Sequence, residues 1–174
     1  AKLAGVRKVF WGIRQTDLKH GQSRWSTIVL ARVNAALSWV IPDTIICCAD
    51  RAKTVHIALG YTSAKCVVIP NGVDLNQFCF DSHKRQTLRR AWGVDESVPL
   101  IGMVARYDAQ KDHANLLHSL MLLKQKARPF HCVLVGLGLS WQNQRLSASI
   151  HQFGLQQDVL LLNQCDDISA VMSA

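Results

Sequence analysis

Two cations, Arg106 and Lys111, lie in one short segment between an apolar run and the start of a predicted helix. A guanidinium group binds phosphate oxygens with a planar fork, and an ammonium group adds a compact charge. The backbone N–H groups at a helix start add a partial positive charge. A diphosphate therefore fits this arrangement. Asp108 and Asp112 flank the cations, so an ordinary pair of surface charges is an alternative of equal weight.

A second segment with ligand-binding features contains Gly136 and Gly138, directly after the apolar run 132–135. Glycine lets the backbone approach a ligand closely, but a pair this short, taken alone, favours an ordinary strand-to-helix turn. Position 141 is Trp, where a dinucleotide fingerprint would require a third glycine. A nicotinamide enzyme is therefore disfavoured.

The sequence Pro70-Asn71-Gly72 predicts a tight turn, because Pro lacks a backbone donor and both Asn and Gly tolerate positive φ. We place a domain boundary here, between residues 1–69 and 70–174. The segment either presents Asn71 and Gly72 to a ligand or is a simple connection, and taken alone the connection is favoured.

The elements that must position these residues follow an alternating pattern. Strands are predicted at 9–13, 44–48, 66–69, 100–105, 132–135 and 159–162, and helices at 24–40, 50–59 and 112–126. Ser140 is a predicted cap for a helix that Gly154 ends, and Asp166 or Asp167 is a predicted cap for a last helix. The continuous apolar runs are typical of parallel strands buried on both faces. The sequence therefore predicts an α/β fold, a Rossmann-like parallel sheet with helices on both faces, with ligands bound beyond residues 69, 104, 135 and 162.

The positive charge of the chain is concentrated in its first part. Residues 1–69 carry ten Lys or Arg and three Asp or Glu, whereas residues 70–174 carry ten and nine. This excess favours a solvated basic surface, with an anionic membrane face or a phosphorylated acceptor as alternatives, and nucleic acid is disfavoured. No membrane span, signal peptide, zinc spacing or CxxC pair occurs. We expect a cytoplasmic protein with reduced cysteines and no metal.

Several of these segments together carry a resemblance to a known family. The sequences Val-Ile-Pro-Asn-Gly-Val-Asp at 68–74, Gly-Met-Val-Ala-Arg at 102–106 and Leu-Val-Gly-Leu-Gly at 134–138, with Phe78 and Lys111, resemble the family-4 retaining glycosyltransferases of GT-B fold. Each piece is weak, and their order and spacing are specific. The resemblance covers roughly residues 44–174. It implies the end of an acceptor-side domain followed by the first part of a domain that binds a nucleotide sugar.

The resemblance also implies roles for single residues. Arg106 and Lys111 would bind the donor diphosphate and stabilise the charge that develops on it as the glycosidic bond breaks. Gly136 and Gly138 would leave room near the nucleotide. The further donor-side residues that it implies are Asn163 and Gln164 at the base, and Asn71 and Gly72 at an interdomain cleft. The donor would be a UDP- or GDP-sugar, and the acceptor a glycan or lipid-linked intermediate of polysaccharide or lipopolysaccharide synthesis.

The sequence departs from the family pattern in three places. Asp112 and Asn163 stand where glycine is common, and the family's paired glutamates have no counterpart before Ala174. We therefore expect this chain, as a fragment, not to transfer sugar by itself. Two alternatives stay open at this point: a sugar-nucleotide epimerase of GT-B fold, and a non-enzymatic basic module that binds membrane or nucleic acid.

Overall fold

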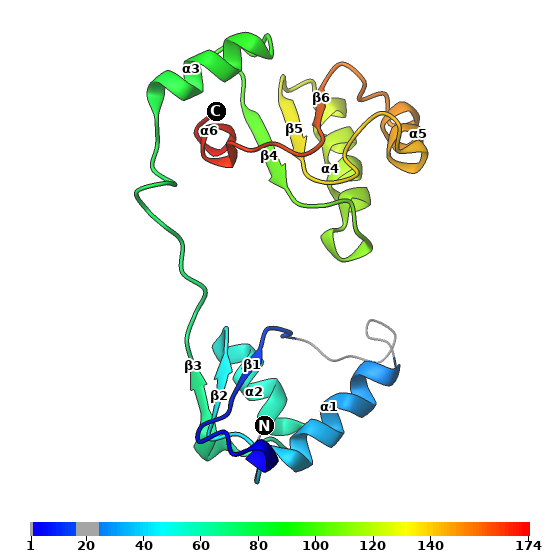
Figure 1. Cartoon of the computed structure of the whole chain (residues 1–174). Coiled ribbons are helices and arrows are strands. Elements are labelled where there is room, and N and C mark those ends of the chain that lie inside the picture. Colours follow the sequence, from blue (N-terminus) through cyan, green and yellow to red (C-terminus); the bar gives the residue numbers. More distant parts are fainter. Residues whose placement is uncertain (1, 17–24) are drawn as a thin grey trace. The chain divides into compact units, whose positions relative to one another are not determined.

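A computed structural model describes residues 2–16 and 25–174, and its chain divides into two compact units, Ala1–Val73 and Asp74–Ala174 (Figure 1). Each unit contains a parallel sheet of three strands in sequential order. The fold class predicted from the apolar runs is therefore confirmed. The start of the first predicted long helix, at Arg24, lies outside the described residues.

Unit 1 is built around a small sheet and two helices. Its elements are η1 (Lys2–Ala4), β1 (Phe10–Ile13), α1 (Trp25–Leu37), β2 (Thr44–Cys47), α2 (Asp50–Ala58), η2 (Ser63–Lys65) and β3 (Cys66–Val68). Ala35 of α1 and Ala52 of α2 pack in one core with Ile45 of the central strand. Both helices therefore contribute to the same hydrophobic core.

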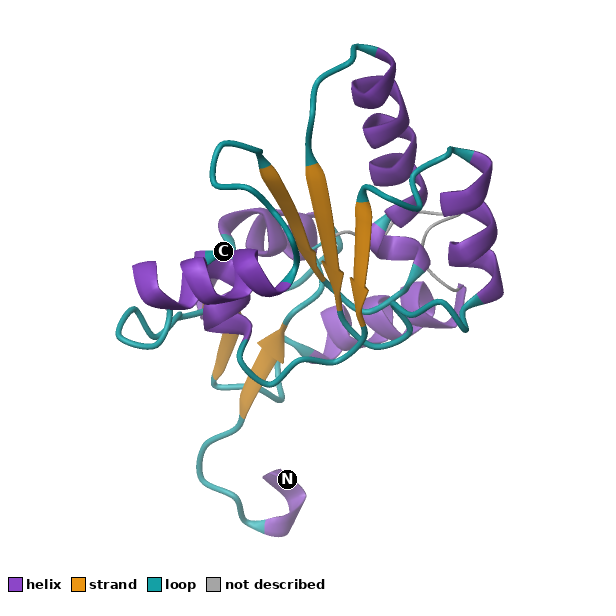
Figure 2. Cartoon of the chain, turned by 90° about the horizontal axis from the view of Figure 1, so that it is seen from above, coloured by secondary structure: helices purple, strands orange, loops and turns teal. Residues whose placement is uncertain are grey.

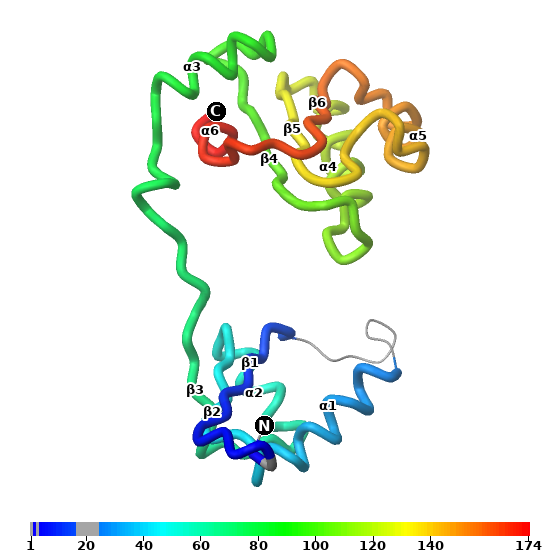
Figure 3. Tube along the Cα trace, viewed as in Figure 1, coloured from blue at the N-terminus to red at the C-terminus, as the bar shows by residue number. Residues whose placement is uncertain are grey.

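Unit 2 also alternates strands and helices, and among the described residues it contains more helices than unit 1, as the chain trace shows (Figure 3). Its elements are α3 (Ser82–Ala91), β4 (Leu100–Val104), η3 (Ala109–Lys111), α4 (His113–Gln125), β5 (His131–Val135), α5 (Gln144–Gln152), β6 (Val159–Leu162) and α6 (Ile168–Ser173). The strands are parallel in the order β4-β5-β6. Their carboxyl ends therefore lie at one edge of the sheet, where the candidate residues follow them.

Helices cover both faces of the unit 2 sheet, and the strands lie side by side between them (Figure 2). The side chains of β5 alternate between these two helical layers. Leu134 packs with Leu117 of α4 and Ile150 of α5, whereas Val135 packs with Val171 of α6. Because successive side chains of a strand point to opposite faces, a strand covered on both sides must be apolar throughout.

Helix α3 was not among the elements that the sequence predicted. Its start has a clear signal, since the carboxylate of Asp81 accepts hydrogen bonds from the backbone N–H groups of His83 and Lys84. Its buried face is unusual, because it includes the side chain of Arg89. A search for apolar periodicity counts an arginine as a surface residue. The sequence pattern therefore did not predict a helix at these positions.

Two local predictions are wrong. Helix α5 is capped by Asn143, whose side-chain oxygen accepts a hydrogen bond from Leu146 N, and not by Ser140. The predicted turn at Pro70-Asn71-Gly72 does not form, and neither Asn71 nor Gly72 adopts a positive φ. Asp167 caps α6, which decides between the two predicted caps.

The described helices are all too short or too polar to cross a membrane. All six cysteines are free thiols in the structure.

Candidate functional site

Arg106 and Lys111 lie in one loop at the carboxyl end of β4 and share a neighbour, Asp108. The guanidinium group of Arg106 pairs with the Asp108 carboxylate at 3.3 Å, and the Arg106 side chain remains 63% exposed. The backbone N–H of Gln110 donates to the same carboxylate and is the main reason that its pKa is lowered, with smaller contributions from the charges of Arg106 and Lys111. The two cations therefore act on one anionic group.

The start of α4 is already occupied by a carboxylate. Asp112 has a left-handed backbone, with φ of 53°, and its side chain accepts a hydrogen bond from Asn115 N. The left-handed conformation gives a physical reason why glycine suits this position. The helix start is consequently less free for an external anion than the sequence suggested, because Asp112 places a negative charge beside Lys111.

Gly136 is required by the packing of the chain against itself. A Cβ atom at this position would collide with the carbonyl oxygen of Ala105 and would lie 2.9 Å from Arg106 N. Its φ of 148° also lies in the range that other residues rarely adopt. Because Gly136 has no side chain, the carboxyl end of β5 can lie directly against the backbone of Ala105 and Arg106. Arg106 carries the guanidinium group that is the candidate phosphate ligand.

Gly138 and Asn163 are joined by hydrogen bonds. The side-chain oxygen of Asn163 accepts from Gly138 N at 3.2 Å, and its carbonyl oxygen accepts from Gly136 N at 2.6 Å. Tyr107 N donates to Leu137 O at 2.8 Å on the other side of this loop. The loops after β4, β5 and β6 are therefore tied together in one structure, and Asn163 uses its side chain to hold the glycine segment.

Gln164 is exposed and lines a pocket of about 430 Å³ together with Trp92, Leu88 and Leu162. This pocket lies between α3, α6 and the end of β6. Its size falls within the range of small-molecule sites, and its lining is mainly apolar. Six of the eight sequence-predicted site residues, Arg106, Lys111, Gly136, Gly138, Asn163 and Gln164, thus follow adjacent strands of one sheet.

Asn71 and Gly72 belong to unit 1. The side-chain oxygen of Asn71 accepts a hydrogen bond from Nη1 of Arg14 at 3.0 Å. Sequence reasoning missed Arg14, although it directly follows the strand β1 and so occupies the same kind of position as Arg106. Gly72 is exposed, with open space around the place of a Cβ atom. That these two residues line a cleft with unit 2 stays a prediction.

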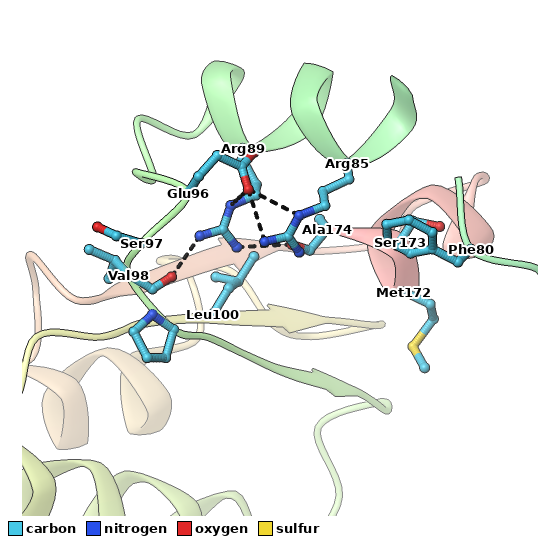
Figure 4. Close-up of a pocket in the computed structure, with 11 residues that line it drawn as sticks. Phe80, Arg85, Arg89, Glu96, Ser97, Val98, Leu100, Met172, Ser173 and Ala174 are labelled. Atoms are coloured by element: carbon cyan, nitrogen blue, oxygen red, sulfur yellow. Dashed lines mark hydrogen bonds and ion pairs between the residues drawn. The ribbon is translucent and has the colours of Figure 1, made fainter. Parts of the chain in front are cut away.

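Two further arginines of unit 2, Arg85 and Arg89, are bonded to other groups of the protein (Figure 4). Arg85 and Arg89 line a pocket of about 460 Å³ near the amino end of β4, and the Arg89 side chain is only 3% exposed. Both guanidinium groups donate to the carbonyl oxygen of Ala174, and Arg89 also donates to Val98 O. These cations are therefore used to join α3 to the rest of the unit.

A metal site is not apparent in the part of the chain that the structure describes, where no group of three or more His, Cys, Asp or Glu residues could hold an ion.

The fold and the site together define a Rossmann-like α/β protein with candidate anion-binding groups at the carboxyl ends of its parallel strands. Residues 84–174 match the family model described as Glycosyl transferases group 1. The match covers more than half of the chain, and the chain belongs to this family.

Several known proteins are similar to this chain. The chain is 27% identical over 175 residues to EpsF of Bacillus subtilis (strain 168), a protein classed by name with the glycosyltransferases, and the alignment covers 99% of this chain and 44% of EpsF. The crystal structure of Anabaena HepE in complex with UDP and glucose has a TM-score of 0.80 and 22% identity, covering 97% of this chain and 44% of HepE. WaaG, a glycosyltransferase involved in lipopolysaccharide biosynthesis, has a TM-score of 0.68 and 14% identity, covering 99% of this chain and 52% of WaaG.

The chain thus spans about half the length of these relatives or less. The structural likeness, at such low identity, establishes the fold.

Proposed function

We propose that this chain is a part of a family-4 retaining glycosyltransferase, the end of its acceptor-side domain and the first part of its donor-binding domain. The enzyme transfers a sugar from a nucleotide-diphosphate sugar to a polysaccharide or lipopolysaccharide intermediate. Membership of the group 1 glycosyltransferases favours sugar transfer over the epimerase and the non-enzymatic alternatives. HepE, which has the same fold, was crystallised with UDP and glucose and with UDP-glucose, and this supports UDP as the nucleotide to test first. The involvement of WaaG, which also shares the fold, in lipopolysaccharide biosynthesis supports a lipopolysaccharide acceptor.

In this proposal the cations of the β4 loop act on the leaving group. The bond between the anomeric carbon and the oxygen of the β-phosphate breaks, and its electron pair moves to the diphosphate. The acceptor hydroxyl oxygen forms the new bond to the anomeric carbon on the same face, and its proton passes to the leaving diphosphate. Arg106 and Lys111 would bind that diphosphate and stabilise its growing negative charge. Gly136 and Gly138 would keep the neighbouring loop free of side chains, and the Asn163–Gln164 segment would contact the base.

The observation that carries the proposal is the position of the two cations. At the end of a parallel strand, the guanidinium group of Arg106 lies 3.3 Å from the Asp108 carboxylate, and the backbone N–H of Lys111 donates to the carbonyl oxygen of Asp108 at 2.9 Å. An anion that entered this loop would therefore meet both charges.

Calorimetry with UDP and GDP tests the donor site. We expect Arg106→Ala and Lys111→Ala each to weaken binding by about 10- to 100-fold, as is usual when a hydrogen bond to a charged group is lost. Lys126→Ala, an exposed lysine beyond the end of α4, is the matched control. Unchanged affinity in both site variants would remove the assignment of these two residues.

The acceptor side of the proposal includes contact with the cytoplasmic face of an anionic membrane. Helix α1 exposes Trp25, Val29 and Val33 on its outer face, and Trp39 is exposed just beyond its end. Exposed tryptophan and aliphatic groups on a basic unit suit the interface of an anionic bilayer. Co-sedimentation with phosphatidylglycerol vesicles should fall in Trp25→Ser, and equal binding to neutral vesicles would contradict the proposal.

A further inference from the structure

Unit 1 contains a small pocket of its own at the carboxyl end of β1. Its volume is about 210 Å³. Ile13, His56 and Tyr61 are buried and form its floor, and Arg14 stands at its exposed rim. This volume is below the roughly 300 to 1,000 Å³ of sites for drug-sized ligands, so the pocket fits a single small ring.

One wall of the pocket is a face of helix α1. Thr27, Leu30, Ala31 and Asn34 line it, at the spacing that places residues on one side of a helix. Within the described residues, the hydroxyl group of Thr27 and the side-chain amide of Asn34 have no hydrogen-bond partner, and both residues are half-buried. Half-buried polar groups without partners are available to a ligand.

The floor of the pocket is formed by rings that are held in place. The rings of His56 and Tyr61 meet edge to face, with centroids 5.2 Å apart. Nδ1 of His56 lies 2.8 Å from the carbonyl oxygen of Ala52, which can only accept, so Nδ1 is the donor and the ring is held in place. The floor therefore combines an apolar aromatic surface with a fixed imidazole.

The chemistry of the lining selects one class of ligand. Among the described residues that line the pocket, Arg14 is the one Lys or Arg, and one of its N–H groups is already bonded to Asn71, which argues against a phosphate site. Unpaired amide and hydroxyl groups beside aromatic rings instead suit a ring that has both hydroxyl groups and apolar C–H faces. We propose that this pocket binds one sugar ring, and that, given the proposed glycosyltransferase function, this ring belongs to the acceptor.

The test is saturation-transfer NMR on the 174-residue chain with the methyl glycosides of glucose, galactose, mannose and N-acetylglucosamine. At least one glycoside should bind with millimolar affinity. Asn34→Leu removes the free amide at similar volume and should weaken binding about tenfold. Thr27→Trp fills the pocket and should abolish binding. Ala36→Leu, an exposed position on the outer face of the same helix, should change nothing.

Two further measurements separate this proposal from the donor site. Thr27→Trp should retain UDP binding, and Arg106→Ala should retain glycoside binding. Failure of UDP to bind, with glycoside binding intact, would overturn the donor assignment alone. The pocket proposal is overturned if no glycoside binds, if Thr27→Trp binds as well as the parent chain, or if inorganic phosphate binds there in place of the sugars. Circular dichroism shows whether each variant is folded.

Discussion

Arg106 and Asp108 form an ion pair in which Nη2 of the guanidinium lies 3.3 Å from Oδ2 of the carboxylate. The other carboxylate oxygen of Asp108 accepts the N–H of Gln110 in the turn that carries Lys111. Asp108 thus holds the shape of the loop, and its negative charge also competes with any anionic ligand for the same cations. A substitution at Asp108 can remove its charge and keep the hydrogen bond that shapes the loop, so the two effects can be measured separately.

Asp108→Asn should strengthen the binding of UDP. Asparagine keeps an oxygen that can accept the Gln110 N–H, and it removes the charge that competes for Arg106. The pair is exposed, so the expected gain is modest, about two- to fivefold at low salt and less at high salt. Calorimetry at two ionic strengths measures it. Asp158→Asn, which removes a carboxylate paired with Lys124 at the opposite end of the sheet, should leave the affinity unchanged; weaker binding in Asp108→Asn would show that the carboxylate assists the ligand.

Asp112 allows a test of the left-handed residue at the start of α4. Asp112→Ala places a methyl group in a backbone conformation with φ of 53° and removes the cap on Asn115 N, so the free energy of unfolding should fall by about 1 to 2 kcal/mol. Asp112→Gly loses the same cap without the conformational cost and should be close to the parent chain. Urea denaturation followed by circular dichroism distinguishes the two. Equal losses in both variants would show that the cap alone matters.

Much of unit 2 was predictable because its strands are buried on both faces. The runs 132–135 and 159–162 are apolar without interruption, and each forms a strand. Helix α3 was not predictable from apolar periodicity, because a buried arginine, which donates to the carbonyl oxygens of Val98 and Ala174, occupies its inner face. Its cap residue, Asp81, was the available signal.

The candidate site was predictable to a similar degree. The loops after β4, β5 and β6 follow from the rule that ligands bind at the carboxyl ends of parallel strands. The hydrogen bonds that join these loops could not be foreseen, since Asn163 and Gly138 are 25 positions apart. The hydrogen bond from Arg14 to Asn71 joins residues 57 positions apart and could not be foreseen for the same reason. Asn143 displaced Ser140 as a cap because its side chain also donates to Gly138 O, which fixes the glycine loop before the helix begins.

The buried ring of His113 should make the unit less stable in acid. His113 is 3% exposed, its ring packs against that of Tyr107, and neither ring nitrogen has a hydrogen-bond partner among the described residues. Burial lowers the pKa of this imidazole, and the charge of Asp112 opposes the effect only partly. The unfolded chain therefore takes up a proton near its ordinary pKa of about 6.5 while the folded ring resists it, so stability falls as pH drops below that value.

His113→Phe is the variant that tests this effect. It breaks no hydrogen bond and should be at least as stable as the parent chain at about pH 7.5, and its stability should fall less between about pH 6.5 and 5. His118→Phe, at an exposed position of the same helix, is the control and should retain the parent pH dependence. Thermal melts across this range give the comparison, and identical slopes in His113→Phe and the parent would contradict the role of burial.

Arg89 should be the most costly arginine to remove. Its guanidinium group is buried and donates to the carbonyl oxygens of Asp95, Val98 and Ala174. In Arg89→Met these oxygens lose a charged donor in a site with little access to water, so the free energy of unfolding should fall by about 3 kcal/mol. The adjacent Arg90 is exposed, and Arg90→Met should change the free energy of unfolding by less than about 0.5 kcal/mol. Urea denaturation of both variants provides the measurement. If Arg89→Met were as stable as Arg90→Met, the buried cation would contribute nothing beyond its packing. The joining of α3 to the rest of unit 2 would then rest on the apolar contacts of Leu88 and Trp92 and on the polar contacts of Lys84 and Arg85.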